Sequence, residues 1–169
     1  MKIKLSILFI ILISNFKITA CECNFIKYVN EEISSSDYVA VGKVISIEKI
    51  FIPDSVYIKQ QIKSGISVDK MSKINMGRYL SKITLKISHV YKGIENNEIQ
   101  TIYTGAGGGD CGFYFEKKKK YLIYANKNSW TTKELISSNE TFKNVLSTNI
   151  CKRTKKYNRK EVRQIKRFI

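Results

Sequence analysis

The chain has 169 residues and a strong excess of basic side chains, with 30 Lys and Arg against 14 Asp and Glu and a formal charge of +16. This length can bury one hydrophobic core without dividing into two domains. The single histidine, His89, belongs to no catalytic motif, and the acidic residues are scattered among lysines. Because the sequence contains no Ser-His-Asp set, paired-carboxylate motif or HExxH helix, we expect no enzyme and no cofactor.

Residues 1–20 have the pattern of a signal peptide. Lys2 and Lys4 precede an apolar run at 5–13 that only Ser6 interrupts, and a more polar stretch ends at Ala20. The run is too short to cross a bilayer, which takes roughly 20 apolar residues as a helix, and no later segment offers such a stretch. We therefore expect export and a single mature domain at 21–169.

The mature chain stays basic, because the loss of three lysines with residues 1–20 lowers the formal charge only from +16 to +13. Such a charge favours binding to an acidic polysaccharide or to an anionic membrane surface. Export makes nucleic acid an unexpected partner. The alternative is that Lys enrichment is a bias of the whole proteome, in which case these side chains are only solvated.

Four cysteines, with none left over, predict two disulfides in an exported chain. A zinc site of all four is the rival, but Cys21 and Cys23 form a CxC and Cys111 and Cys151 are isolated, unlike the usual paired CxxC ligands. A bond between Cys21 and Cys23 would close a very small strained ring, so two pairings remain. Either pairing closes loops of about 90 to 130 residues and stabilises the fold by about 4 to 5 kcal/mol for each bond.

The periodicity of the sequence predicts a mainly β domain. Helical spacing favours a short helix at 25–33, and β-branched residues favour a strand at 38–47, with Val39, Val41, Ile45 and Ile47 on one face. Residues 50–78 hold the only proline and show weak periodicity, which predicts a long excursion between strands. We expect this excursion to supply a contact surface. Alternation then predicts further strands at 83–88, 98–103, 113–115 and 121–125.

Five short strands separated by turn residues indicate a small barrel. One further edge strand is expected at Leu135 and Ile136. After Cys151 the chain is rich in Lys and Arg, and the spacing of Val162, Ile165 and Ile169 predicts an amphipathic C-terminal helix with a solvated charged face.

The glycine-rich segment at 105–112 is the strongest local signal, and it even contains a bare GxGxxG pattern. No βαβ unit surrounds it and a strand is expected after it, so nucleotide binding is not predicted. Glycine instead allows close packing of the backbone around Cys111. Aromatic residues could stack nucleobases, but core packing explains them better; they are Tyr103, Phe113, Tyr114, Phe115, Tyr121 and Tyr124.

Several short motifs occur together in this chain. They are the CxC at 21–23, Val-Gly-Lys-Val at 41–44, Tyr-Lys-Gly at 91–93, Gly-Gly-Gly-Asp-Cys-Gly at 107–112, Phe-Glu-Lys at 115–117, Tyr-Leu-Ile-Tyr-Ala at 121–125 and Thr-Asn-Ile-Cys at 148–151. Their order resembles that of bacterial relatives of the tissue inhibitors of metalloproteinases, which are netrin-like domains. The resemblance covers nearly all of residues 21–165.

The resemblance implies a five-stranded OB-fold barrel with flanking helices, and disulfides that join Cys21 to Cys111 and Cys23 to Cys151. It also implies a metalloprotease inhibitor. The free α-amine and the carbonyl of Cys21 would chelate the protease zinc, and Glu22 would point into the specificity pocket. Glu22 stands where the animal inhibitors carry a small hydroxyl residue, and their third disulfide and C-terminal domain have no counterpart here.

Two alternatives stay open at this stage. Ile18-Thr19-Ala20-Cys21 approximates a lipobox, and a thioether-linked lipid on Cys21 would make a cell-envelope lipoprotein. That reading leaves three cysteines, an odd number, and so favours the disulfide. The second alternative is a non-inhibitory envelope or extracellular interaction domain that binds polyanions or protein partners.

Overall fold

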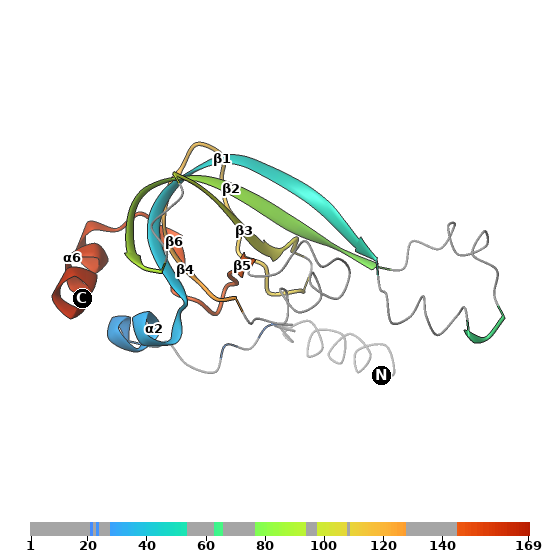
Figure 1. The fold of residues 1–169 in the computed structure, drawn as a ribbon, viewed down its shortest axis with the longest axis horizontal. Helices are drawn as coiled ribbons and strands as arrows, with labels where there is room; N and C mark the ends of the chain where they lie inside the picture. The colour runs from blue at the N-terminus through green and yellow to red at the C-terminus, as the bar shows by residue number, and fades with distance from the viewer. Residues whose placement is uncertain are drawn as a thin grey trace, which may run out of the picture.

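The computed structural model describes residues 21, 23, 28–53, 63–65, 77–93, 98–107, 109–127 and 145–169. In these residues the chain is mainly β, with six strands in one mixed sheet and two helices beside it (Figure 1). The prediction of a mainly β fold is confirmed. The elements are α2 Val29–Ser35, β1 Tyr38–Pro53, β2 Gly77–Lys92, β3 Ile99–Gly105, β4 Lys120–Ala125, β5 Leu146–Ser147, β6 Lys155–Lys156 and α6 Arg159–Phe168.

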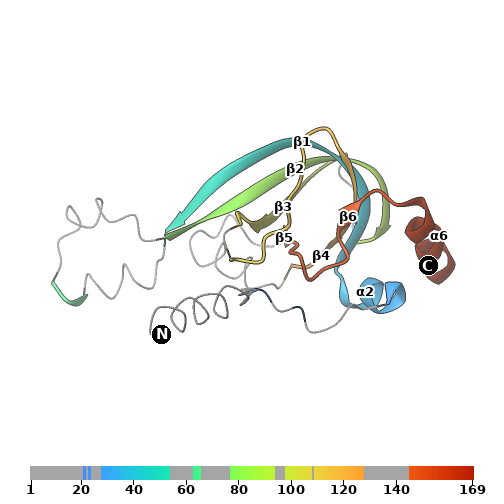
Figure 2. The same cartoon turned by 180° about the vertical axis from the view of Figure 1, so that it is seen from behind.

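The strand order is β5-β3-β2-β1-β4-β6, and all neighbours are antiparallel except β3 and β5. The β1–β2 hairpin is the longest part of the sheet and projects away from the helices (Figure 1). Seen from behind, the edge strand β6 lies beside α6 (Figure 2). Among the described residues no helix is both long and apolar enough to span a membrane.

The hairpin corrects the bounds predicted for the excursion at 50–78. Ile50 pairs with Leu80 and Pro53 pairs with Gly77, so both ends of the predicted segment belong to β1 and β2. Cross-strand pairing extends the two strands beyond their regions of clear alternation. Of the remaining excursion, only 63–65 lies within the described residues.

The main core lies on one face of the curved sheet. Tyr38, Ala40 and Val44 of β1 point into it, and a Cβ at Gly42 would lie only 2.9 Å from the Ile87 side chain. Gly42 therefore lets β2 pack closely at this point. The buried members are Tyr38, Ala40, Val44, Ile83, Leu85, Ile102, Phe115, Tyr121, Ile123, Ala125 and Leu146.

The opposite face of β1 and β4 is covered by the two helices. Val39 and Val41 pack there with Leu122 and Tyr124 of β4, and α2 and α6 contribute Val29, Ile33, Val162 and Ile165. The prediction that Ile45 and Ile47 share this buried face is wrong. The register shifts between Val44 and Ser46, and both isoleucines are 40% exposed, because the bulge ends the regular alternation of the strand.

Two further sequence predictions need correction. Residues 113–115 form no strand, because the Phe113 N–H donates to the side-chain oxygen of Thr104 instead of joining a ladder. Ile169 follows the C-terminal helix and is 67% exposed, whereas Val162 and Ile165 are buried as expected. The predicted edge strand at Leu135 and Ile136, and residues 25–27 of the predicted first helix, lie outside the described residues.

An isolated β-bridge joins the end of β4 to β5. Asn126, directly after β4, and Ser147 of β5 exchange both backbone hydrogen bonds, each 2.9 Å long. Asn126 also donates through its side chain to the carbonyl of Ser35 at the end of α2. The end of β4 is therefore fixed to β5 and to α2 at once.

Candidate functional site

The two disulfides join the beginning of the expected mature chain to two distant segments. Cys21 is bonded to Cys111 and Cys23 to Cys151, with Cα atoms 5.6 and 5.1 Å apart. This is the pairing that the family resemblance implied. Cys21 is half-buried and Cys23 is exposed, whereas Glu22 lies outside the described residues. A lipid thioether on Cys21 would need the sulfur that this bond uses.

The turn that carries Cys111 is organised by a single carboxylate, that of Asp110. Its two oxygens accept hydrogen bonds from the backbone N–H groups of Ala106, Gly107 and Gly112, at 2.7, 3.0 and 3.1 Å. Hydrogen bonds from N–H groups to an ionised carboxylate are stronger than neutral ones. Asp110 therefore holds the backbone on both sides of the half-cystine.

The glycines of this turn are needed for close packing, as the sequence predicted. A Cβ at Gly105 would lie 2.4 Å from the Asp110 carboxylate, and a Cβ at Gly112 would lie 2.2 Å from the Gly105 carbonyl oxygen. Gly107 has φ of 95°, and Cys111 itself has φ of 58°, a left-handed conformation that is uncommon for a residue with a side chain. The turn thus presents Cys111 in one defined orientation.

The second anchor, Cys151, lies beside the first. The Ile150 N–H donates to the Cys111 carbonyl at 3.0 Å, and the Cys151 N–H donates to the side-chain oxygen of Asn149 at 3.0 Å. The N–H of Thr148 donates in turn to the carbonyl of Tyr103 in β3. Both half-cystine partners are therefore fixed to each other and to the sheet.

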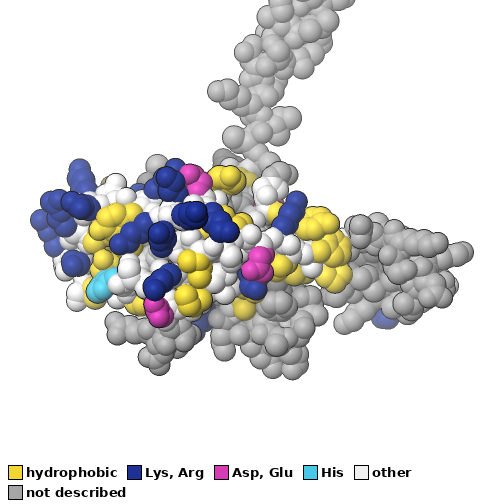
Figure 3. Space-filling view, turned by 90° about the horizontal axis from the view of Figure 1, so that it is seen from above, with side chains coloured by type: hydrophobic (Ala, Val, Ile, Leu, Met, Phe, Trp, Pro, Cys, Tyr) yellow, Lys and Arg dark blue, Asp and Glu magenta, His cyan; other side chains and the backbone are white. Residues whose placement is uncertain are grey.

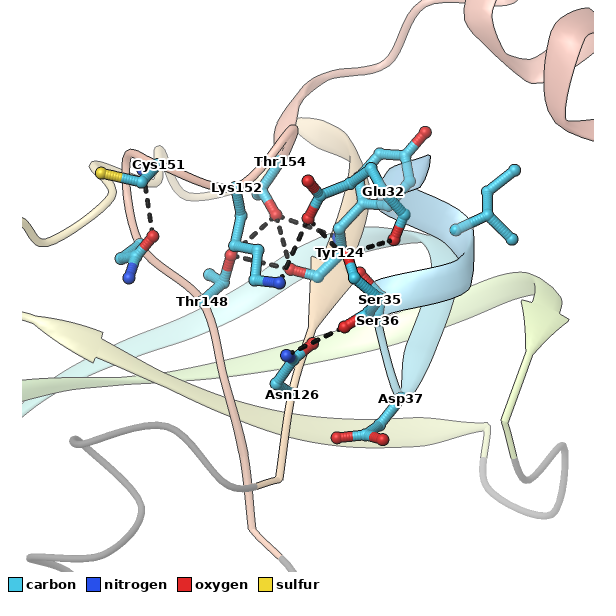
Figure 4. A network of polar contacts seen from close by, with 12 residues as sticks. Glu32, Ser35, Ser36, Asp37, Tyr124, Asn126, Thr148, Cys151, Lys152 and Thr154 are labelled. Atoms are coloured by element: carbon cyan, nitrogen blue, oxygen red, sulfur yellow. Dashed lines mark hydrogen bonds and ion pairs between the residues drawn. The ribbon is translucent and has the colours of Figure 1, made fainter. Parts of the chain in front are cut away.

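A largely buried network of polar contacts surrounds the segment that carries Cys151 (Figure 4). Lys152, next to Cys151, places its ammonium 3.2 Å from the carboxylate of Glu32 on α2, and Glu32 is only 1% exposed. The hydroxyls of Thr148 and Thr154 are hydrogen-bonded to each other at 2.8 Å, and both lie within 3.0 Å of the Tyr124 carbonyl oxygen of β4, which accepts from one of them. The segment around Cys151 is thus bound to a helix and a strand.

An apolar hollow of about 120 Å³ adjoins the Cys111 turn. It lies between the turn and the base of the β1–β2 hairpin, and its lining includes Ile47, Ser81, Ala106, Phe113 and Tyr114. Tyr114 is 82% exposed, so the prediction that this ring belongs to the core is wrong. The other predicted core aromatics, Tyr103, Phe115, Tyr121 and Tyr124, are buried, and Phe113 is partly buried.

Sequence reasoning missed the residues that position the half-cystines. In the sequence, Glu32 and Lys152 have the pattern of ordinary surface charges. Asp110 is a single acidic residue beside a glycine run, and no motif indicates its hydrogen bonds. The single histidine, His89, is exposed, and its ring contacts that of Tyr91 at a centroid distance of 4.4 Å. Within the described ranges, no cluster of three His, Cys, Asp or Glu could hold a metal ion.

No protein-family model matches the chain, and no curated protein matches it. Any assignment of function therefore depends on the geometry of the half-cystines and on the sequence resemblance described above.

Proposed function

We propose that the chain is an exported netrin-like inhibitor of zinc metalloendopeptidases, whose mature N-terminus is Cys21. The observation that carries this proposal is the double clamp on the terminus: Cys21 is bonded to Cys111 and Cys23 to Cys151, two segments that are themselves hydrogen-bonded to each other. The arrangement leaves Cys21 half-buried and Cys23 exposed at the surface.

The chemistry of a free N-terminus at Cys21 suits a protease zinc. An α-amine has a pKa of about 7.7 to 8, so it is readily deprotonated near neutral pH, and a bound metal cation favours the deprotonated form further. Catalytic zinc keeps an open coordination position beside its three protein ligands. The α-amine and carbonyl of one residue, Cys21, would displace the attacking water and chelate the zinc, which would then be five-coordinate.

Rigidity explains why such a short segment would bind tightly. A ligand that is already in its bound conformation avoids the cost of ordering on association. Here the carboxylate of Asp110 fixes the Cys111 turn, and the Lys152–Glu32 ion pair fixes the segment of Cys151. The two disulfides transmit both restraints to the terminus.

The apolar surface beside Cys111 offers supporting contacts to a protease. Tyr114, three residues after Cys111, and Ile150, directly before Cys151, are 82% and 46% exposed. Farther along the hairpin, Phe51 and Tyr79 are also exposed, and their ring centroids lie 5.3 Å apart. Exposed aromatic residues with few rotatable bonds commonly dominate the energy of protein interfaces.

Glu22 sets a requirement for the target. A carboxylate that enters an apolar pocket without a partner is strongly disfavoured. We therefore expect the inhibited endopeptidase to carry a Lys or Arg within its specificity pocket, where it would pair with Glu22. Endopeptidases with a wholly apolar pocket are expected to bind weakly.

The fold proposed for this function is an OB-type barrel made of β1 to β5. The strand order β5-β3-β2-β1-β4, the parallel pairing of β3 with β5 and the bridge between Asn126 and Ser147 support it. Export through a signal peptide at residues 1–20 is part of the same proposal, and disulfides, which persist in oxidising compartments, support it.

Titration against a panel of zinc endopeptidases tests the proposal. The oxidised chain that begins at Cys21 is compared with the same chain extended by one Ala before Cys21, and with a matched chain extended by one Ala after Ile169. We expect stoichiometric inhibition by the first and third proteins and its loss in the second, because the extension removes the free amine of Cys21. Inhibition that survives the N-terminal extension, or no inhibition of any member of the panel, contradicts the proposal.

A further inference from the structure

Three lysines form a row across neighbouring strands of the sheet. In the strand register Lys43 of β1 is opposite Lys86 of β2 on one side and opposite Lys120 of β4 on the other. All three side chains are exposed. Neighbouring strands lie about 4.8 Å apart, so the backbones of the three lysines lie within about 10 Å across the sheet.

The row continues the sheet face that the two helices cover. Side chains alternate along a strand, so Lys43 shares a face with Val39 and Val41, and Lys120 shares it with Leu122 and Tyr124. Helices α2 and α6 bury those four residues but leave the two lysines exposed. Figure 3 shows one face of the molecule, on which Lys and Arg side chains gather with few acidic side chains among them.

Only part of this charge is neutralised within the protein. Lys86 pairs with Glu98 at 2.7 Å, but both side chains are more than 60% exposed. Within the part of the chain that the structure describes, Lys43 and Lys120 form no ion pair. Lys120 instead lies over the ring of Tyr157 at 4.8 Å, an arrangement that orients the cation but leaves its charge in place.

The row is unfavourable for the free protein. Like charges directly opposite each other on adjacent strands are destabilising, and Lys43 has such a neighbour on both sides. Thr84 of β2 is opposite Thr101 of β3, and it lies two residues before Lys86 along β2. The hydroxyls of these threonines suit a ligand that carries hydroxyl groups as well as anionic groups. A ligand with several negative groups would relieve the repulsion and use these hydroxyls.

We propose that the row of Lys43, Lys86 and Lys120 is a binding site for a linear acidic polysaccharide, with its anionic groups along the row. A line of charges matches a chain of anionic groups better than it matches the plane of headgroups in a membrane. The ring of Tyr157 lies at one end of the row, where the Lys120 ammonium packs over it.

This site is separate from the half-cystines. Strand β3 carries Ile99, opposite Lys86, at one end and Gly105, beside the Cys111 turn, at the other. At about 3.4 Å per residue these ends are roughly 20 Å apart. The inference therefore does not depend on the proposed inhibition, and either can fail without the other.

The test measures binding of heparin, a heavily sulfated polysaccharide, to the oxidised chain at low and at high salt. The variant replaces Lys43, Lys86 and Lys120 by Gln. Its matched control replaces Lys49, Lys63 and Lys166 by Gln, which removes the same charge from exposed positions elsewhere. Three exposed ion pairs together are expected to change the affinity about tenfold, so the row variant loses about tenfold and the control changes little.

Two further arms identify the ligand class. Vesicles of neutral lipid with an added anionic phospholipid probe a membrane surface, and uncharged dextran probes the sugar backbone alone. Heparin binding that weakens steeply with salt, with weaker binding to both other probes, supports the proposal. Equal losses in the row variant and its control, stronger binding to vesicles than to heparin, or no heparin binding at low salt overturns it.

Discussion

The backbone N–H of Ile150 donates to the carbonyl of Cys111 over 3.0 Å, and this bond joins the two segments to which the disulfides tie Cys21 and Cys23. Cys111 and Cys151 are 40 residues apart in the sequence, yet a single hydrogen bond places their chains side by side. Each disulfide therefore supports the position of the other. The terminus that we propose to bind zinc is therefore restrained by two disulfides whose partner segments are hydrogen-bonded to each other.

Removal of the second disulfide should lower the stability of the fold strongly. Replacing both Cys23 and Cys151 by Ala leaves the Cys21–Cys111 bond closed, so the loop that opens runs through that bond and has roughly 40 residues. The chain-entropy estimate for a loop of this length is about 4 kcal/mol. Urea denaturation of the double variant should show a loss of this order, and a loss below about 1 kcal/mol would show that the remaining contacts already fix this segment.

The Asp110 carboxylate should determine the position of Cys111. Its replacement by Ala leaves three backbone N–H groups without their acceptor, and we expect a loss of about 2 kcal/mol in the free energy of unfolding and weaker inhibition. Urea denaturation and the inhibition constant measure the two effects. If inhibition is unchanged in a destabilised variant, the turn does not position the terminus.

Two glycine substitutions separate crowding from backbone strain in the same turn. Gly105→Ala places a Cβ 2.4 Å from the Asp110 carboxylate and should disturb the turn as the loss of Asp110 does. Gly107→Ala meets nothing within 4 Å and should cost only about 1 kcal/mol for its φ of 95°. Thermal unfolding should rank the Gly105 variant as the less stable, and the reverse order would contradict the described packing.

Glu161 should make the fold sensitive to acid. Burial acts to raise the pKa of this carboxyl, but hydrogen bonds from Arg153, Lys155 and Tyr124 outweigh it and lower the pKa below the ordinary 4.5. The unfolded chain then takes up the proton first, so the stabilisation is complete above about pH 4.5 and is lost as the pH falls through the lowered pKa. Urea denaturation between pH 7 and pH 3 measures this loss.

A pair of glutamine variants isolates the contribution of Glu161. Glu161→Gln should cost about 2 kcal/mol at pH 7 and should reduce the decline toward pH 3. Glu48, whose side chain is 53% exposed and pairs with Lys82 at the surface, provides the control, and Glu48→Gln should change neither quantity by much. An acid decline of the same size in both variants would assign it to other carboxylates.

Repulsion within the lysine row should be measurable without any ligand. Lys43→Gln removes the central charge and should raise the free energy of unfolding by about 0.3 kcal/mol at low salt. The gain should fade near 1 M salt, where the screening length is about 3 Å. Lys86→Gln is the comparison, because it also breaks the pair with Glu98 and should give less. Destabilisation by Lys43→Gln at low salt would contradict the described repulsion.

The strands could be found from the sequence because they are rich in β-branched and aromatic residues. All four long strands lie where alternation predicted them, but β1 and β2 extend farther because each stabilises the other across the hairpin. The strands β5 and β6 have only two residues each and carry no periodic signal. The region at 113–115 looked like a strand because its three aromatic residues have high β-propensity, although two of the rings pack inward around an irregular backbone.

The polar contacts were harder to predict, because burial of a charge depends on partners far away in the sequence. Glu161 belongs to a strongly basic helix whose charged face was expected to be solvated, yet it is 5% exposed and contacts Arg153 and Lys155. Its position three residues after Asn158, which caps α6, was the available signal. The lysine row depends on shifts of register between β1 and β2 that no local pattern indicates.

The most direct test of the central claim is the intact mass and N-terminal sequence of the mature protein recovered from an exporting host. We predict a chain that begins at Cys21 with an unmodified α-amine, and a mass four hydrogens below that of the reduced chain, because all four cysteines are paired. A lipid on the Cys21 sulfur, an acylated amine, four free thiols or a chain that begins before Cys21 would contradict it.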